Sequence, residues 1–178
     1  MLRVEDALAT ILSYISPLET ESVSLLDAVG QVLAEDVQST FDLPQADNSA
    51  MDGYAVRSQD IIGATRENPT LLPVIDEVPA GHVPMAKVNP HTAIRIMTGG
   101  LIPAGADTVV RFEDTDEMDR REQGESLDHI AITSEAAVGT AVRPAGEDVT
   151  RGDLVLPNGT ILQPAEIAVL AALGRSSV

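Results

Sequence analysis

The chain has 178 residues, which is enough for one domain or two small ones. Its 28 Asp and Glu residues outnumber 11 Lys and Arg residues, giving a formal net charge of -17. Such a chain lacks the basic surface that binds nucleic acid or an anionic membrane. Cysteine is absent, which excludes disulfide frameworks, zinc ribbons and thiol nucleophiles, and a hydrophobic share of 44% is too high for a wholly disordered chain.

The N-terminal part is predicted to contain two helices. Between residues 4 and 15, apolar side chains recur at the spacing of one helical face, which predicts a helix with a buried stripe. A shorter helix is predicted from Leu25 to Ala34, with Ser24 as its N-cap. The first six residues lack the layout of a signal peptide, and no stretch approaches the ~20 apolar residues of a membrane span. We therefore expect a cytoplasmic protein.

The middle of the chain is predicted to be rich in strands. Short β-like runs are separated by Gly and Asn-Pro turn residues, and residues 114–128 form a charge-rich segment that we expect to be a solvated loop. The four predicted strands are Leu71–Val78, Ala93–Met97, Asp107–Phe112 and His129–Thr133.

The C-terminal part is predicted to form a hairpin and a helix. Leu154–Leu156 and Thr160–Leu162 flank a Pro-Asn-Gly turn, and Pro164 suits the first position of a buried helix that ends near Gly174. The predicted fold class is therefore α+β. A discontinuous α/β body (1–45 and 141–178) would carry a small inserted all-β domain (46–140).

The segment between Pro44 and Tyr54 has the most unusual composition in the chain. It places Asp47, Asn48, Ser49 and Asp52 beside small residues that let a backbone approach a ligand closely. Two interpretations stay open at this point. The segment is either a loop that holds a polar ligand or a hydrated magnesium ion, or a solvated loop of turn-forming residues.

Two further segments have residues suited to chemistry. Thr98-Gly99-Gly100 follows a predicted strand and is either an anion-binding turn or a plain connector. Arg143 precedes Asp148 by five residues across a Pro/Gly turn, which is either a surface ion pair or a phosphate clamp beside a metal-facing carboxylate. The common phosphate-loop, dinucleotide and G-x-S-x-G motifs are missing, and the three histidines lack metal-site spacing.

Together these segments resemble the signature of the molybdopterin molybdenumtransferase family, the MoeA and gephyrin E-domain type. The resemblance covers almost the whole chain, but only the first two domains of the family. It rests on three strings in the family's order: Leu43-Pro44 followed by Asp47 to Ala55, Met97-Thr98-Gly99 with Pro103 to Val110, and Arg143 to Asp148.

The resemblance implies a function and a set of site residues. Family members insert molybdenum into molybdopterin: with magnesium, they take adenylylated molybdopterin and molybdate and release AMP. By position, Asp52, Asp148, Thr98 and Arg143 match residues of the family's active site. Asn48, Ser49 and Gly99 are the expected cofactor-binding residues, and which carboxylate binds metal is left open. All of these residues should converge in space as half of a pocket.

The same resemblance implies that the chain is incomplete as an enzyme. Family members are homodimers whose active site lies between the β-rich domain of one chain and a larger domain of the other, and that larger domain is missing from this sequence. We therefore expect no appreciable turnover by these 178 residues alone. The family's glycine turn usually has Thr-Gly-Ala-Pro, whereas Gly100-Leu101 stands here, so the turn is expected to be less preorganised.

Two alternatives to the enzyme interpretation are considered. The first is a non-catalytic dimerisation or partner-binding module on the same scaffold. The second is a magnesium-dependent phosphohydrolase that uses Asp42, Asp47 and Asp52.

Overall fold

The computed structural model describes residues 3–178 and divides the chain into two compact units. Unit 1 combines the N-terminal residues up to Gln38 with 154–178, and unit 2 consists of Ser39–Asp153. These bounds lie outside the predicted 45/46 and 140/141, because the two connecting segments pair with each other: the Leu43 N–H donates to the Val149 carbonyl over 2.7 Å. The predicted arrangement of an inserted domain stays a prediction.

Unit 1 is built around a two-stranded sheet and a C-terminal helix. Strand β1 (Val37–Gln38) pairs antiparallel with β9 (Leu154–Leu156), and α3 (Pro164–Ala172) begins with a capping box and Pro164 in its first turn. The strand Leu154–Leu156 and the C-terminal helix are thus confirmed, but the predicted hairpin is wrong: β9 pairs with β1, and residues 160–162 form only an isolated bridge from Ile161 to Val32. The core of unit 1 consists of Leu25, Ala28, Leu33, Val37, Leu156, Leu162, Ile167 and Leu170.

Two N-terminal predictions need correction. Helix α1 (Val4–Leu12) forms, but none of its residues is buried, so the predicted buried stripe is wrong: within residues 3–178 no element covers it. The predicted helix over 25–34 is only a 3₁₀ turn, η1 (Leu25–Ala28). The chain leaves the helical path at Val29, which is extended, and the Gly30 N–H then donates to the Leu162 carbonyl while Val32 forms a bridge with Ile161.

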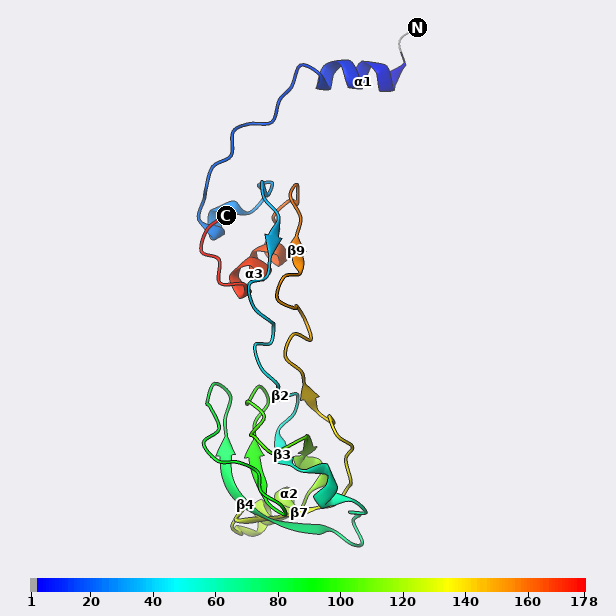
Figure 1. The fold of residues 1–178 in the computed structure, drawn as a ribbon, viewed down its shortest axis with the longest axis vertical. Coiled ribbons are helices and arrows are strands. Elements are labelled where there is room, and N and C mark those ends of the chain that lie inside the picture. The colour runs from blue at the N-terminus through cyan, green and yellow to red at the C-terminus, as the bar shows by residue number, and fades with distance from the viewer. Residues whose placement is uncertain (1–2) are drawn as a thin grey trace. The chain divides into compact units, whose positions relative to one another are not determined.

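Unit 2 holds a five-stranded mixed sheet in the order β6-β3-β5-β4-β7 (Figure 1). Only β4 and β5 run parallel, and the other neighbours are antiparallel. The four strands predicted for the middle of the chain are confirmed, whereas β3 was not predicted. The bounds are β3 Gly53–Val56, β4 Thr70–Val78, β5 Ala93–Ile96, β6 Thr108–Arg111 and β7 His129–Ile132.

Both faces of this sheet are covered by apolar side chains. One core cluster contains Tyr54, Val56, Leu72 and Ile130, and the other contains Ala55, Val78, Ile94 and Val109. Neighbouring residues of β3 thus belong to different clusters, as expected for a strand whose side chains alternate between two faces.

The charge-rich segment 114–128 is folded, so its prediction as a solvated loop is wrong. After the 3₁₀ turn η3 (Phe112–Asp114), the chain forms α2 (Glu117–Gln123), which ends at the left-handed Gly124. Ion pairs from Asp116 to Arg120 and from Glu117 to Arg121, each four residues apart, stabilise this short helix. Unit 2 is therefore a sheet with a helix, in place of the predicted all-β domain. A further 3₁₀ turn, η2 (Ser58–Ile61), follows β3.

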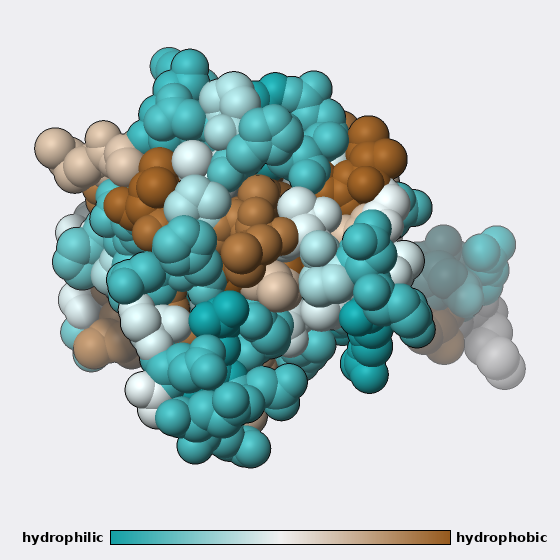
Figure 2. Space-filling model, turned by 90° about the horizontal axis from the view of Figure 1, so that it is seen from below, coloured by the Kyte–Doolittle hydropathy of each residue, from teal (hydrophilic) through white to brown (hydrophobic). Residues whose placement is uncertain are grey.

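The surface agrees with the acidic composition. The side of the molecule in Figure 2 is mostly hydrophilic, with hydrophobic side chains in small separate groups. In the described part of the chain, no helix has the length and apolar run that crossing a bilayer requires.

Candidate functional site

A short strand joins the three segments that the sequence singled out. Strand β2 (Asn48–Ser49) pairs with β8 (Val142–Arg143), with Asn48 opposite Arg143. On its other side, the Ser49 N–H donates to the Gly100 carbonyl over 2.9 Å and the Gly99 N–H donates to the Ser49 carbonyl over 2.8 Å. The acidic loop, the glycine turn and the Arg143 turn therefore lie side by side, as expected from the sequence.

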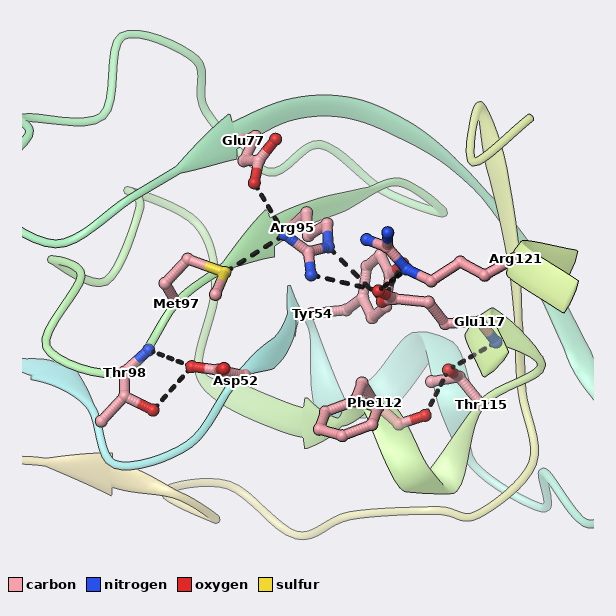
Figure 3. Close-up of polar contacts among 10 residues, drawn as sticks. All are labelled: Asp52, Tyr54, Glu77, Arg95, Met97, Thr98, Phe112, Thr115, Glu117 and Arg121. Carbon is pink, nitrogen blue, oxygen red and sulfur yellow. Dashed lines mark hydrogen bonds and ion pairs between the residues drawn. The ribbon is translucent and has the colours of Figure 1, made fainter. Parts of the chain in front are cut away.

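Asp52 and Thr98 form the closest polar pair of this site (Figure 3). Both the backbone N–H and the hydroxyl of Thr98 donate to Asp52 Oδ1, each over 2.7 Å. The pairing of Gly53 with Ile96 explains the contact, because Asp52 directly precedes β3 and Thr98 is the second residue after β5.

The environment of Asp52 favours its ionised form. The backbone hydrogen bond from Thr98 lowers the pKa of Asp52 most, the Thr98 hydroxyl adds to the effect, and the charge of Arg95 contributes further. Within residues 3–178, only Oδ1 accepts hydrogen bonds, so Oδ2 is available to a water, a cation or a substrate donor.

Arg143 and Asp148 form a second polar pair on the neighbouring turn. Arg143 Nη2 lies 2.8 Å from Asp148 Oδ2, and its Nε lies 2.7 Å from Glu147 Oε2. The hydrogen bond to Glu147 raises the pKa of Arg143 most, followed by that to Asp148. The turn is held against the acidic loop, because the Ala145 N–H donates to Asp47 Oδ1 over 2.8 Å. Two carboxylates of the chain thus already neutralise the positive charge of Arg143.

The three expected cofactor-binding residues use their polar groups within the chain. Ser49 is buried and its hydroxyl donates to the Met51 carbonyl, while the Asn48 amide donates to the Ala46 carbonyl over 3.3 Å. The Gly99 N–H is already bonded to Ser49, so it does not point freely at an anion. These contacts shape the loop, and cofactor binding by Asn48, Ser49 and Gly99 stays a prediction.

Sequence reasoning missed a buried ionic network beside Asp52. Glu117 of α2 is 2% exposed and accepts a hydrogen bond of 2.6 Å from the Tyr54 hydroxyl. It also accepts hydrogen bonds from Arg95 Nη2 (3.1 Å) and Arg121 Nε (2.8 Å). The spacing of Glu117 and Arg121, four residues apart, is a sequence pattern that predicts the helix. No local pattern predicts that Tyr54 and Arg95 also bind Glu117.

Burial and pairing act in opposite directions on these groups. Burial alone would raise the pKa of Glu117, but hydrogen bonds from Tyr54, Arg95 and Arg121 outweigh it, and the pKa lies below its usual value. Burial, together with the bond to Glu117, raises the pKa of Tyr54. The network therefore holds an ionised carboxylate beside a neutral phenol.

The donor groups present fit a hydrated magnesium ion better than a bare one. Within the described residues, no group of three or more His, Asp or Glu side chains is placed to hold a metal. Magnesium usually keeps several waters and binds through one or two carboxylates plus substrate phosphates, and Asp52 Oδ2 suits that mode.

Within the described residues, the three carboxylates of the phosphohydrolase alternative do not form a group placed to hold a metal ion. Asp42 accepts the Arg151 N–H, Asp47 accepts the Ala145 N–H, and Asp52 accepts the Thr98 N–H. Asp42 and Asp47 both bond the loop that contains residues 145–151, whereas Asp52 bonds Thr98 on another turn, and the phosphohydrolase stays a prediction without support from a metal-binding group.

Comparison with known proteins identifies the family. The family profile for the "MoeA N-terminal region (domain I and II)" matches residues 2–174. The chain belongs to the MoeA family. The resemblance seen in the sequence is thereby confirmed.

Relatives within the MoeA family match most of the length of the chain. Molybdopterin molybdenumtransferase 2 of Mycobacterium tuberculosis is 46% identical over 157 residues, which are 88% of this chain and 37% of the relative. The molybdopterin molybdenumtransferase of Staphylococcus aureus is 38% identical over 175 residues, 98% of this chain and 40% of the relative. The chain thus spans about two fifths of the length of these curated MoeA relatives.

A solved MoeA structure has the same fold. The crystal structure of the molybdopterin biosynthesis moeA protein from Pyrococcus horikoshii OT3 matches with a TM-score of 0.88 and 41% identity, covering 98% of this chain and 44% of that one.

Proposed function

We propose that the chain supplies one side of an active site at which a MoeA protein inserts molybdenum from molybdate into adenylylated molybdopterin and releases AMP. The observation that carries this proposal is the junction at β2, which brings the Asp52–Thr98 pair and the Arg143–Asp148 pair onto neighbouring segments. The names of the relatives, molybdopterin molybdenumtransferase, supply the reaction class.

The local charges favour a role for a divalent cation. Glu147 and Asp148 both pair with the single arginine Arg143, so this turn carries a net negative charge, and Asp52 on the neighbouring segment is also kept ionised. Distant carboxylates of the chain matter less, because salt screens charges beyond ~8 Å at physiological ionic strength. A magnesium ion would neutralise the phosphate oxygens of the substrate when bound.

The residues of the chain would then position the reacting groups. Asp52, kept ionised and oriented by Thr98, presents Oδ2 to a water in the shell of the ion or to a substrate donor. Asp148 and Arg143 act on the neighbouring turn, where Arg143 either pairs with phosphate or keeps the Asp148 loop in place. The dithiolene sulfurs that bind molybdenum belong to the pterin, so the lack of cysteine is no obstacle.

A graft onto a full-length relative tests the assignment. This chain replaces the matching N-terminal two fifths of the Staphylococcus aureus relative, and the graft is assayed for molybdenum cofactor formation. Asp52→Asn and Asp148→Asn should each reduce the rate at least tenfold, because both keep the shape of the side chain but lose its charge. Glu67→Gln removes an exposed acid as a matched control. A wild-type rate in either variant would remove that residue from the mechanism.

The isolated chain should show no appreciable turnover in the same assay. It spans only about two fifths of its curated relatives, and one side of a pocket does not enclose a substrate. Cofactor formation by the pure 178-residue protein would contradict this expectation.

Helix α1 favours an additional role in dimerisation. Its apolar stripe is more than half exposed at every position, and it consists of Val4, Leu8, Ile11, Leu12 and Ile15 together with the turn that follows the helix. Exposed apolar stripes of this kind mark contacts with another protein surface. The second candidate function is thus a homodimerisation module, which is compatible with the first.

A further inference from the structure

The buried network and the proposed site share one face of the sheet. Tyr54 stands opposite Arg95 in the β3–β5 pair, and their side chains therefore lie on the same side. Asp52 precedes Tyr54 by two residues and Met97 follows Arg95 by two, so both point to that same side as well. Figure 3 shows the resulting row, from Glu117 through Arg95 to Asp52.

Arg95 is tied to three parts of unit 2. Its Nη2 and Nε donate to the buried Glu117 over 3.1 and 3.4 Å, and its Nη1 donates to Glu77 of β4 over 2.7 Å. The same Nη1 lies 3.1 Å from Met97 Sδ, and Met97 is the residue directly before Thr98. The guanidinium thus connects a helix, an adjacent strand and the start of the glycine turn.

Stability alone gives a weak reason for burying these charges. Taking an ion pair out of water costs so much free energy that well-packed apolar residues often serve as well or better. Glu117 is 2% exposed, and the Arg95 side chain is 16% exposed. A network of this kind fixes geometry, because each guanidinium bond accepts only a narrow range of directions.

We propose that Glu117 is a positioning residue: through Arg95 it holds the Met97–Thr98 backbone where Thr98 donates both its N–H and its hydroxyl to Asp52. The inference rests on the proposed function, in which the Asp52–Thr98 pair belongs to the active site; Glu117 would fix the geometry of this pair. Glu117 itself touches no substrate group in this scheme. Its effect on the reaction passes through Arg95 and Thr98.

The second arginine on Glu117 supplies a matched control. Arg121 binds the same carboxylate over 2.8 Å, but its side chain is 51% exposed, and among the described residues it makes no hydrogen bond or ion pair to β5 or Met97. Arg121→Gln therefore removes one cation from Glu117 without cutting the link to Thr98. Arg95→Gln removes one cation and the link together.

The test follows the Thr98 amide by NMR in the 15N-labelled chain. Its N–H donates to an ionised carboxylate, so it should resonate downfield and exchange slowly with water. Glu117→Gln and Arg95→Gln should each accelerate this exchange at least tenfold and remove the downfield shift. In Arg121→Gln, exchange should stay within twofold of the wild type.

A further variant covers the case in which Glu117→Gln does not fold, visible as lost dispersion of the β3 and β7 amides. Arg95→Lys keeps the charge beside Glu117 but cannot bond Glu117, Glu77 and Met97 with one planar group, so it should give the same loss at Thr98 in a folded protein. An unchanged Thr98 amide in folded Glu117→Gln or Arg95→Lys overturns the inference. An equal loss in Arg121→Gln also overturns it.

This readout needs no substrate and fails independently of the proposed function. A preserved Thr98 signal in Glu117→Gln and Arg95→Lys, together with low activity of the Asp52→Asn graft, contradicts only the positioning role of Glu117. A lost Thr98 signal in those variants, together with full activity of the Asp52→Asn graft, supports the positioning role and contradicts the proposed function. In an active graft, Glu117→Gln should lower kcat about tenfold more than Arg121→Gln does, with similar KM.

Discussion

At Gly53, a single added methyl group would collide with the backbone of the neighbouring strand. A Cβ at this residue would lie 2.0 Å from the Val110 carbonyl oxygen and 2.9 Å from Arg111 Cα, both of them backbone atoms of β6. Non-bonded heavy atoms pack best at roughly 3.5–4.0 Å, so β3 and β6 would have to separate by more than about 1 Å.

The expected cost of Gly53→Ala follows from that overlap. Overpacking a well-filled interior costs about 1–3 kcal/mol, and a backbone hydrogen bond lost at this end of the β3–β6 ladder adds about 1 kcal/mol. The free energy of unfolding of unit 2 should therefore fall by about 3 kcal/mol. The change should also displace Asp52, the preceding residue, from Thr98.

Removing the other tyrosine makes the loss of stability measurable in unit 2 alone. The chain has two tyrosines and no tryptophan, and Tyr14 is 86% exposed whereas Tyr54 is fully buried. In a Tyr14→Phe protein, Tyr54 is the only tyrosine, so its fluorescence during urea unfolding reports on the sheet of unit 2. The midpoint and slope of that transition give the free energy of unfolding.

Gly63→Ala separates the clash from the general effect of an added methyl group. Gly63 has a φ of 76° and no atom within 4 Å of an added Cβ, so its substitution brings only backbone strain of about 1–2 kcal/mol. If Gly53→Ala proves no more destabilising than Gly63→Ala, the close approach of β3 to β6 is not the reason for glycine at position 53.

Three further predictions concern the network and the first helix. The pKa of Glu117 is lower in the folded protein than the ordinary value of 4.5. The ionised Glu117 therefore stabilises the fold fully above pH 4.5, and this contribution is lost as pH falls through the folded-state pKa. Glu117→Gln should flatten the dependence of the urea midpoint on pH in this range. Tyr54→Phe should cost about 2 kcal/mol in urea unfolding followed by circular dichroism, which needs no tyrosine signal, because the change removes a bond of 2.6 Å to an ionised group. Leu8→Glu combined with Ile11→Glu should reduce the sedimentation coefficient to that of a monomer, and an unchanged value would exclude α1 from a dimer contact.

Local patterns predicted four of the five strands in the sheet of unit 2, because turn residues bound each run and the runs carry the residue types of strands. They also predicted α1, but periodicity shows only that a helix has an apolar face and not whether anything covers it. The same limit applies to the turn at Gly99, for which the sequence left an anion-binding turn and a plain connector open, and the structure bonds the Gly99 N–H to the Ser49 carbonyl. What a backbone group bonds to depends on distant segments, which a local pattern does not contain.

Glu117 shows this limit most clearly. A glutamate in an acidic, arginine-rich segment is typical of a solvated surface, and its burial depends on partners that lie 63 residues away at Tyr54 and 22 residues away at Arg95. The three site strings, by contrast, were found in the sequence because their order and composition are unusual as a set. Their contact through β2 follows from the fold, in which Asn48 pairs with Arg143.

Arg143 is the residue for which the sequence left two interpretations open, a surface ion pair and a phosphate clamp. Its guanidinium is partly exposed and bonded to Glu147 and Asp148, while its backbone supplies the pairing with Asn48. Arg143→Gln should therefore leave the urea midpoint of unit 2 almost unchanged, because side-chain pairs at this exposure contribute little.

The activity of the same variant decides between the two interpretations. In the graft assay, a phosphate clamp predicts that Arg143→Gln lowers cofactor formation at least tenfold with a raised KM for the adenylylated pterin. Loop support for Asp148 predicts a lowered kcat at unchanged KM, because the substrate still binds while the carboxylate is misplaced. A rate equal to that of the Glu67→Gln control would leave Arg143 as a surface ion pair, and the substrate phosphate would then have to be neutralised by groups other than this arginine.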